Sequence, residues 1–335
     1  MRVAALLHPR PEGLYCPPGD FYIDPVRPVD KALITHGHAD HARAGHGAVM
    51  ATQRTLDIME IRYGAGFAGA VQAVDAATVS VNGVEVSFHP AGHVLGSAQI
   101  RVAHKGISIV AAGDYKRGDD PSAEPFDPVR GDVFITEATF GLPVFRHPDP
   151  RAEIARLLTS VERFPDRAHL VGVYALGKAQ RVICLLRNAG YDRPIYIHGA
   201  LAKLCDYYQS QGVELGELRP ATVEGGGRGQ FAGEIILGPP SAFAAKWAQR
   251  FRDPLIAFAS GWMQVRARAR QRGVELPLVI SDHCDWGELT GTISELSPRE
   301  VWVTHGREEA LVRWCALQGQ AARPLNLVGY EDEAE

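Results

Sequence analysis

The segment Thr35–His41, with the sequence THGHADH, concentrates metal-binding side chains in a very short window. Three histidines and one aspartate (His36, His38, Asp40 and His41) fall within six positions. They follow the apolar run KALIT at 31–35, which is typical of a buried strand. Imidazole and carboxylate groups suit zinc and other first-row divalent ions. The segment therefore predicts a metal site, and the alternative is a polar surface loop that happens to be rich in histidine.

One loop cannot supply all the ligands of a metal site. Further candidate ligands stand at the ends of later predicted strands. His93 lies in PAGHVLGSA, Asp114 ends ISIVAAGD, and His305 follows the apolar run VWVT. Each of these residues has a glycine neighbour and follows a strand, where loops position functional groups on a rigid support. A single histidine in such a place is usually structural. The joint pattern indicates that these three side chains complete the site.

The composition limits the class of protein. The chain has 335 residues, 46% of them hydrophobic and 22% charged, which is enough for a sizeable core and about two domains. A net charge of −4 argues against a protein that coats duplex DNA, so any nucleic-acid contact has to be local. We expect a cytoplasmic protein, because the N-terminal residues lack the pattern of a signal peptide and no apolar run approaches about 20 residues.

The five cysteines are odd in number and scattered, without a C-x-x-C spacing. This pattern fits neither a disulfide framework nor a thiolate zinc site. We expect reduced thiols that pack as small apolar groups.

The pattern of predicted elements changes along the chain. Up to about residue 140 it predicts strands, with hairpin turns at Asn82-Gly83 and Lys105-Gly106. From about Pro148, strands alternate with helices, one of which is expected in SAFAAKWAQRF at 241–251. This alternation predicts a parallel sheet. We therefore expect one domain made of residues 1–145 and 277–335, and an inserted α/β domain at 146–276. The glycines at 225–227, followed by Arg228, indicate a flexible loop and not a phosphate cradle.

The candidate metal ligands resemble those of the metallo-β-lactamase fold, an αββα sandwich. They are His36, His38, Asp40, His41, His93, Asp114 and His305. Asp24 in FYIDP matches the family's early supporting aspartate. The α/β insertion, Glu137 in TEATF and His283 in SDHCDW resemble the β-CASP branch, whose members are nucleases. Further stretches (LYCPPGDFYIDP, GDYKR, TFGLP, YALGKAQ, SGWM and THG) are similar to one bacterial subgroup, the DNA-ligase-associated exonucleases. The similarity runs over nearly the whole chain.

The resemblance implies two divalent metal ions, with zinc as the first choice and manganese as the alternative. One ion would be held by His36, His38 and His93, the other by Asp40, His41 and His305, with Asp114 as the bridge. Two cations about 4 Å apart can activate water and offset charge on the leaving oxygen. The implied catalytic residues are His283 as general acid, Glu137 as its hydrogen-bond partner, and Asp40. The alternative for His283 is a further ligand or a structural histidine.

Nucleic-acid contacts are predicted from positive charge. Arg266, Arg268 and Arg270 fall in the run QVRARARQR, and Lys178 and Arg181 stand at a predicted helix start. Such side chains position a phosphate backbone without reading sequence. The alternative is an ordinary solvated surface. Trp262 and Tyr174 are weaker candidates for base stacking, and core packing is the favoured explanation for both.

Four functions are compatible with these residues. The first is a nuclease on single-stranded or end-containing DNA, an exonuclease in DNA repair beside an ATP-dependent DNA ligase. The second is an RNA-processing nuclease of the same branch, endo- or exonucleolytic, in which a histidine such as His305 is more typical. The third, a small-molecule hydrolase, does not need an insertion of about 130 residues. The fourth, a non-catalytic scaffold, conflicts with a ligand set in which no member is missing. The sequence leaves the polarity of digestion and the oligomeric state open.

Overall fold

The chain consists of two compact units, residues 1–146 with 283–334 and residues 147–282, called here the first unit and the inserted unit. The computed structural model describes residues 3–75, 77–222, 230–243, 246–325 and 327. The predicted glycine loop at 225–227, with Arg228, lies outside the described residues. Among the helices that are described, none combines the length and apolar character needed to cross a bilayer.

Two β-sheets form the centre of the first unit. The first sheet has the order β1-β2-β3-β4-β5-β6, with β1 at His8–Arg10, β2 at Gly13–Cys16, β3 at Phe21–Ile23, β4 at Lys31–Leu33, β5 at His46–Ala51 and β6 at Ala68–Ala73. The second has the order β19-β18-β11-β10-β9-β8-β7, with β7 at Val79–Val81, β8 at Val84–Pro90, β9 at Ala98–His104, β10 at Ile107–Ala111, β11 at Val133–Ala138, β18 at Glu300–Gly306 and β19 at Ala322–Pro324. The chain therefore returns after the insertion to complete the second sheet.

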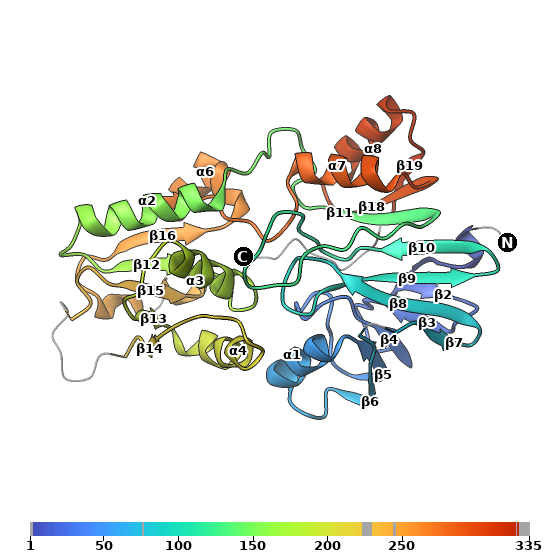
Figure 1. Ribbon diagram of the computed structural model, residues 1–335, viewed down its shortest axis with the longest axis horizontal. Helices are drawn as coiled ribbons and strands as arrows, with labels where there is room; N and C mark the ends of the chain where they lie inside the picture. The colour runs from blue at the N-terminus through green and yellow to red at the C-terminus, as the bar shows by residue number, and fades with distance from the viewer. Residues whose placement is uncertain (1–2, 76, 223–229, 244–245, 326, 328–335) are drawn as a thin grey trace. The chain divides into compact units, whose positions relative to one another are not determined.

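The first unit is built in four layers, α-β-β-α. Alternating strand residues face opposite sides of a sheet, so Ile109 of β10 packs between the sheets while Val110 packs outward. The outer face of the second sheet is covered by α7 (Trp286–Leu296) and α8 (Glu308–Leu317). The outer face of the first sheet is covered by α1 (Gln53–Tyr63). Figure 1 shows these helices on either side of the two sheets.

Both predicted hairpins are confirmed. Strands β7 and β8 pair antiparallel around Asn82 and Gly83, whose φ angles are 51° and 80°. Strands β9 and β10 pair antiparallel around Lys105 and Gly106, with φ angles of 48° and 75°. Two consecutive positive φ values are the signature of the type I′ turn, whose twist matches that of the flanking strands.

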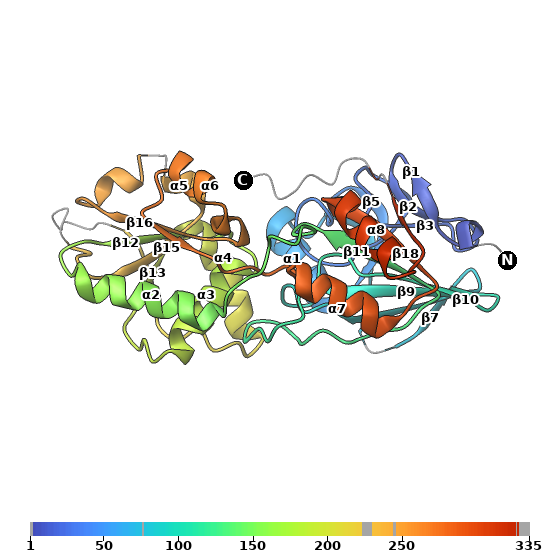
Figure 2. The same cartoon turned by 90° about the horizontal axis from the view of Figure 1, so that it is seen from above.

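The inserted unit contains a six-stranded sheet in the order β14-β13-β15-β12-β16-β17, with β12 at His169–Gly172, β13 at Ile195–Ile197, β14 at Leu218–Pro220, β15 at Ile235–Gly238, β16 at Leu255–Ala259 and β17 at Leu276–Leu278. All of its strand pairs are parallel, as predicted. The longer helices are α2 (Pro150–Arg163), α3 (Lys178–Asn188) and α4 (Gly199–Ser210). Figure 2 shows α2 and α3 on one side of the sheet, with α5 (Pro240–Phe243) and α6 (Arg266–Gln271) on the other.

One expected helix, in SAFAAKWAQRF at 241–251, forms only in part. The described residues there contain the short α5 and a 3₁₀ turn, η2, at Ala248–Arg250. The rings of Trp247 and Phe251 lie 5.0 Å apart, and Phe251 lies 5.3 Å from Phe231. Burial of these aromatic side chains outweighs the local helical preference, which is a weak determinant of structure.

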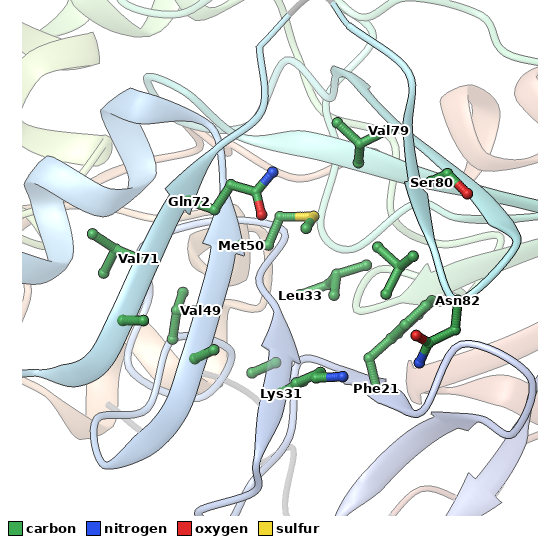
Figure 3. A pocket seen from close by; sticks show the side chains of 14 residues that line it. Phe21, Lys31, Leu33, Val49, Met50, Val71, Gln72, Val79, Ser80 and Asn82 are labelled. Atoms are coloured by element: carbon green, nitrogen blue, oxygen red, sulfur yellow. The ribbon is translucent and has the colours of Figure 1, made fainter.

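An apolar groove opens in the first unit between β4–β6 and β7. Its volume is about 410 Å³, and its lining includes Leu33, Met50, Val71 and Val79. Figure 3 shows Met50 and Leu33 among the side chains that line this groove. None of the predicted metal ligands lines this groove, so it is separate from the metal-binding loops. All five cysteines are buried and unbridged, as expected.

Candidate metal centre

Four of the predicted ligands converge on one point in the first unit. One ligand atom from each of His36, His38, His93 and Asp114 lies within 4.8 Å of the other three, and all four residues are buried. The Nδ1 atom of His38 is 3.0 Å from Nε2 of His93. Oδ2 of Asp114 is 3.4 Å from Nε2 of His36 and 3.8 Å from Nε2 of His93. These three imidazoles and one carboxylate form the first ligand group.

A second group meets the same carboxylate. Oδ2 of Asp114 is also 3.4 Å from Nε2 of His41. That nitrogen is 3.6 Å from Oδ2 of Asp40, and the ring of His305 is centred 5.2 Å from the ring of His41. Asp114 therefore stands between two sets of donor atoms.

Backbone irregularities aim the ligands at this point. The pairing of β11 with β18 shifts register between Thr136 and Ala138, and His305 has a φ of 60°. A bulge of this kind redirects side chains at the end of a strand. A non-glycine residue in the left-handed region is a local strain typical of functional sites. The bulge and the left-handed residue thus lie at Glu137 and His305, just before β11 and β18 pair again at Ala138 and Gly306.

Asp24 supports the predicted ligand His41 through a hydrogen bond and also binds Thr35. Its Oδ2 accepts hydrogen bonds from Nδ1 of His41 at 2.8 Å and from the hydroxyl of Thr35 at 2.6 Å. Its Oδ1 accepts from the backbone N–H of Thr35 at 2.8 Å. A carboxylate on Nδ1 fixes the histidine tautomer that leaves Nε2 available for a metal. This geometry fits the supporting role expected for Asp24.

Thr35 is a supporting residue that the sequence did not single out. Its Oγ1 lies 3.0 Å from Nδ1 of His36. Since the hydroxyl proton goes to Asp24, the oxygen is left to accept from the Nδ1–H of His36. Gly113 has a φ of 59°, and a Cβ there would lie 2.7 Å from Thr35 Oγ1, so only glycine leaves room for this arrangement. Thr35 thus orients His36 as Asp24 orients His41.

Replacing Thr35 by valine, which keeps the shape but removes the hydroxyl, should weaken metal binding by about tenfold, as is typical for a lost ligand support. The measurement is a titration of metal-free protein with Zn²⁺ against a competing chelator. Thr35→Ser, which keeps the hydroxyl, serves as the control and should bind like the parent. Equal affinities for the valine and serine variants would contradict the orienting role.

The electrostatics of the cluster favour bound cations. Burial disfavours charged imidazole and lowers the pKa of His36 well below its usual value. Loss of hydration likewise lowers the pKa of His305 to about 4. For His41 burial acts in the same direction, but the carboxylates of Asp114 and Asp40 outweigh it and raise its pKa well above the usual value. Burial opposes ionisation of Asp114 too, yet His41 and other histidines hold its pKa well below normal.

The donor set fits the implied metal ions. Neutral imidazole is the metal-binding form of histidine, and low pKa values keep His36 and His305 in that form. Buried carboxylates need a compensating positive charge, which a divalent cation supplies. The first group, with three imidazoles and one carboxylate, matches the ligand types that zinc accepts.

His283 and Glu137 form a pair beside the first group. Nδ1 of His283 lies 3.0 and 3.2 Å from the two carboxylate oxygens of Glu137. The ring of His283 is centred 4.6 Å from that of His93. Glu137 is fully buried and also accepts from the backbone N–H of Tyr115 at 2.9 Å. Burial raises the pKa of Glu137. Glu137 therefore holds the His283 ring through its Nδ1 atom.

The residues predicted to bind nucleic acid fall into two groups. Lys178 and Arg181 are each only 2% exposed. Nζ of Lys178 donates to Asp282 at 2.5 Å and to the carbonyl of Ile280 at 3.1 Å. This corrects the expectation for Lys178, because its charge is neutralised inside the inserted unit.

The arginine run behaves differently. Arg266 and Arg270 are exposed on α6, whereas Arg268 lies over the ring of Trp262 at 4.0 Å. Tyr174 packs with the ring of Phe258 at 6.3 Å, as expected for a core residue. Arg266 and Arg270 therefore remain the accessible charges of the predicted set.

Comparison with known proteins finds similarity to proteins that are named as nucleic-acid enzymes. No family model matches the chain. A "Probable DNA ligase" from Opitutus terrae is 26% identical over 321 residues, which covers 90% of this chain and 30% of that protein. "Endoribonuclease ysh-1" from Neurospora crassa is 30% identical over 243 residues, covering 59% of this chain and 28% of the relative. "Cleavage and polyadenylation specificity factor subunit 3" from Dictyostelium discoideum is 36% identical over 138 residues, covering 38% of this chain and 17% of the relative.

The chain thus spans about 30% or less of the length of these curated relatives. Among solved structures, a protein of unknown function from Enterococcus faecalis V583 matches with a TM-score of 0.57 at 13% identity. The match covers 88% of this chain and 78% of that chain, so the two share the mixed α/β fold.

Proposed function

We propose that this protein is a metal-dependent nuclease of the metallo-β-lactamase fold with an inserted β-CASP domain. The observation that carries the proposal is the convergence of His36, His38, His93 and Asp114 next to the His283–Glu137 pair. The α-β-β-α layering of the first unit and the parallel sheet of the inserted unit support the fold assignment. The similarity to proteins named as endoribonucleases and as a probable DNA ligase supports action on nucleic acid.

The positions of the side chains support the following roles. His36, His38 and His93 would hold one ion, Asp40, His41 and His305 the other, and Asp114 would bridge them. Two bound divalent ions supply Lewis-acid stabilisation of the phosphate and water of lowered pKa. His283, held through Nδ1 by Glu137, would present a proton at Nε2 to the leaving 3′ oxygen. Asp24 and Thr35 would keep His41 and His36 in the metal-binding tautomer.

DNA is the preferred substrate in this proposal. The relative named as a probable DNA ligase matches 90% of this chain, whereas the endoribonuclease match covers 59%. This favours an exonuclease that trims DNA ends beside a DNA ligase, with Arg266 and Arg270 contacting the phosphate backbone. RNA processing is the second candidate, supported by the higher identity of the endoribonuclease match, 30% against 26%.

The test compares single strands of DNA and RNA of one sequence, each labelled at the 5′ or the 3′ end, with metal content measured on the same preparation. We expect cleavage of DNA that a chelator abolishes and added Zn²⁺ or Mn²⁺ restores. Faster cleavage of RNA would shift the assignment to the second candidate. Turnover of small esters without cleavage of either nucleic acid would overturn the proposal.

A further inference from the structure

Lys178 stands in a place where a positive charge is unfavourable. It is the first residue of α3, and its side chain is 3% exposed. The N-terminal end of a helix carries a partial positive charge that disfavours a cation. Removing an ammonium group from water adds a further cost. A lysine in this position therefore needs a specific partner.

That partner is the segment that carries the proposed general acid. Nζ of Lys178 donates to Oδ1 of Asp282 at 2.5 Å and to the backbone carbonyl of Ile280 at 3.1 Å. Asp282 is itself 2% exposed and directly precedes His283. Consecutive Cα atoms are about 3.8 Å apart, so a tether on Asp282 restricts the backbone of the next residue.

The other side of His283 is also tethered. The backbone N–H of Cys284 donates to the carbonyl of Tyr115 at 2.9 Å, and the N–H of Tyr115 donates to Glu137 at 2.9 Å. Glu137 in turn holds Nδ1 of His283. The histidine is therefore fixed through its side chain and through the following residue within the first unit. The preceding residue, Asp282, is held by its ion pair with Lys178.

We propose that Lys178 and Asp282 form a positioning pair, which holds the backbone of His283 so that Nε2 points at the leaving oxygen. This inference rests on the proposed function, because it assumes that His283 is the general acid. Buried ion pairs contribute little net stability compared with apolar residues of similar size. Stability therefore does not explain the pair, whereas its place next to His283 does.

The experiment uses the full chain with its metals and two DNA substrates. One is an ordinary strand, and the other has sulfur in place of the leaving 3′ oxygen. A thiolate leaves without a proton near neutral pH, since thiols ionise far more readily than alcohols. Lys178→Met should lower kcat on the ordinary strand by about tenfold through misplacement of the acid, with KM nearly unchanged. On the sulfur strand its kcat should stay within about twofold of the parent.

A double variant keeps the inference testable if the single one folds poorly. Lys178→Met with Asp282→Leu removes both charges, and such a replacement is commonly neutral or stabilising. It should have the stability and metal content of the parent but the same tenfold loss on the ordinary strand. The matched control is Arg193→Met, which breaks the Arg193–Glu234 pair (2.5 Å) in the inserted unit and should leave both substrates unaffected.

The outcomes separate the two claims. If the parent cleaves neither nucleic acid, the proposed function fails. If the parent is active and the variants cleave the ordinary strand at the parental rate, only the positioning role fails. The role is also overturned if the variants lose activity equally on both strands, or if KM rises while kcat holds, as loss of a phosphate contact would produce.

Discussion

Exchange of Asp114 for asparagine is expected to remove at least one of the two proposed metal ions and to lower turnover by about 10³-fold. Oδ2 of Asp114 lies 3.4 Å from Nε2 of both His36 and His41, so this carboxylate serves both ligand groups. The amide keeps the shape but loses the negative charge that offsets two cations. Metal ions supply several kcal/mol of transition-state stabilisation, and about 4 kcal/mol corresponds to a 10³-fold change in rate.

The measurement combines metal analysis of the purified variant with cleavage of end-labelled DNA. Asp127→Asn is the matched control, since Asp127 is an exposed carboxylate of the same unit that pairs with His89 at 3.2 Å. The control should keep both ions and full activity. An Asp114→Asn protein with two ions and parental turnover would exclude Asp114 as the bridge.

The convergence of the ligands could be anticipated from the sequence because each candidate stands at or just after the end of a strand. Adjacent strand ends meet at one edge of a sheet, and β10, β11 and β18 are neighbours in the second sheet. Which imidazole faces which carboxylate was not derivable, since it depends on the bulge at Thr136–Ala138 and the left-handed turn at His305.

The supporting residues were not predictable for a different reason. A threonine at the end of a strand is ordinary, and nothing in the sequence marks Thr35 as a partner of Asp24. Lys178 and Asp282 are 104 residues apart, and their pairing arises only when α3 packs against the segment after β17. From the sequence, Lys178 therefore resembled a surface charge available to phosphate, and the structure buries it instead.

The fold, too, could be predicted from the sequence only in part. Alternation of strands and helices predicted a parallel sheet in the inserted unit, because the residue pattern records which faces are buried. The strand order β14-β13-β15-β12-β16-β17 leaves no such record, since it is set by the way the helices cross over the sheet. The expected helix at 241–251 was wrong in extent because aromatic packing around Trp247 outweighs propensity.

Removal of the proposed general acid by His283→Ala should keep both metal ions and lower turnover of ordinary DNA by on the order of 100-fold or more. His283 contacts Glu137 through Nδ1, and its ring lies 4.6 Å from His93, close to the ligands. Loss of a proton donor raises the barrier only when the leaving oxygen needs a proton. The strand with sulfur at the leaving position should therefore lose far less activity in this variant.

The matched control is His104→Ala, because His104 lies in the same unit and its Nδ1 contacts only the carbonyl of Gly83 at 2.9 Å among the hydrogen bonds of the described residues. A ligand and a general acid give opposite results in this comparison. If His283 were a further metal ligand, the alanine variant would lose metal and both strands would be cleaved equally slowly. If it donates the proton, metal content is parental and the sulfur strand is spared, which ties the His283–Glu137 pair to phosphodiester chemistry.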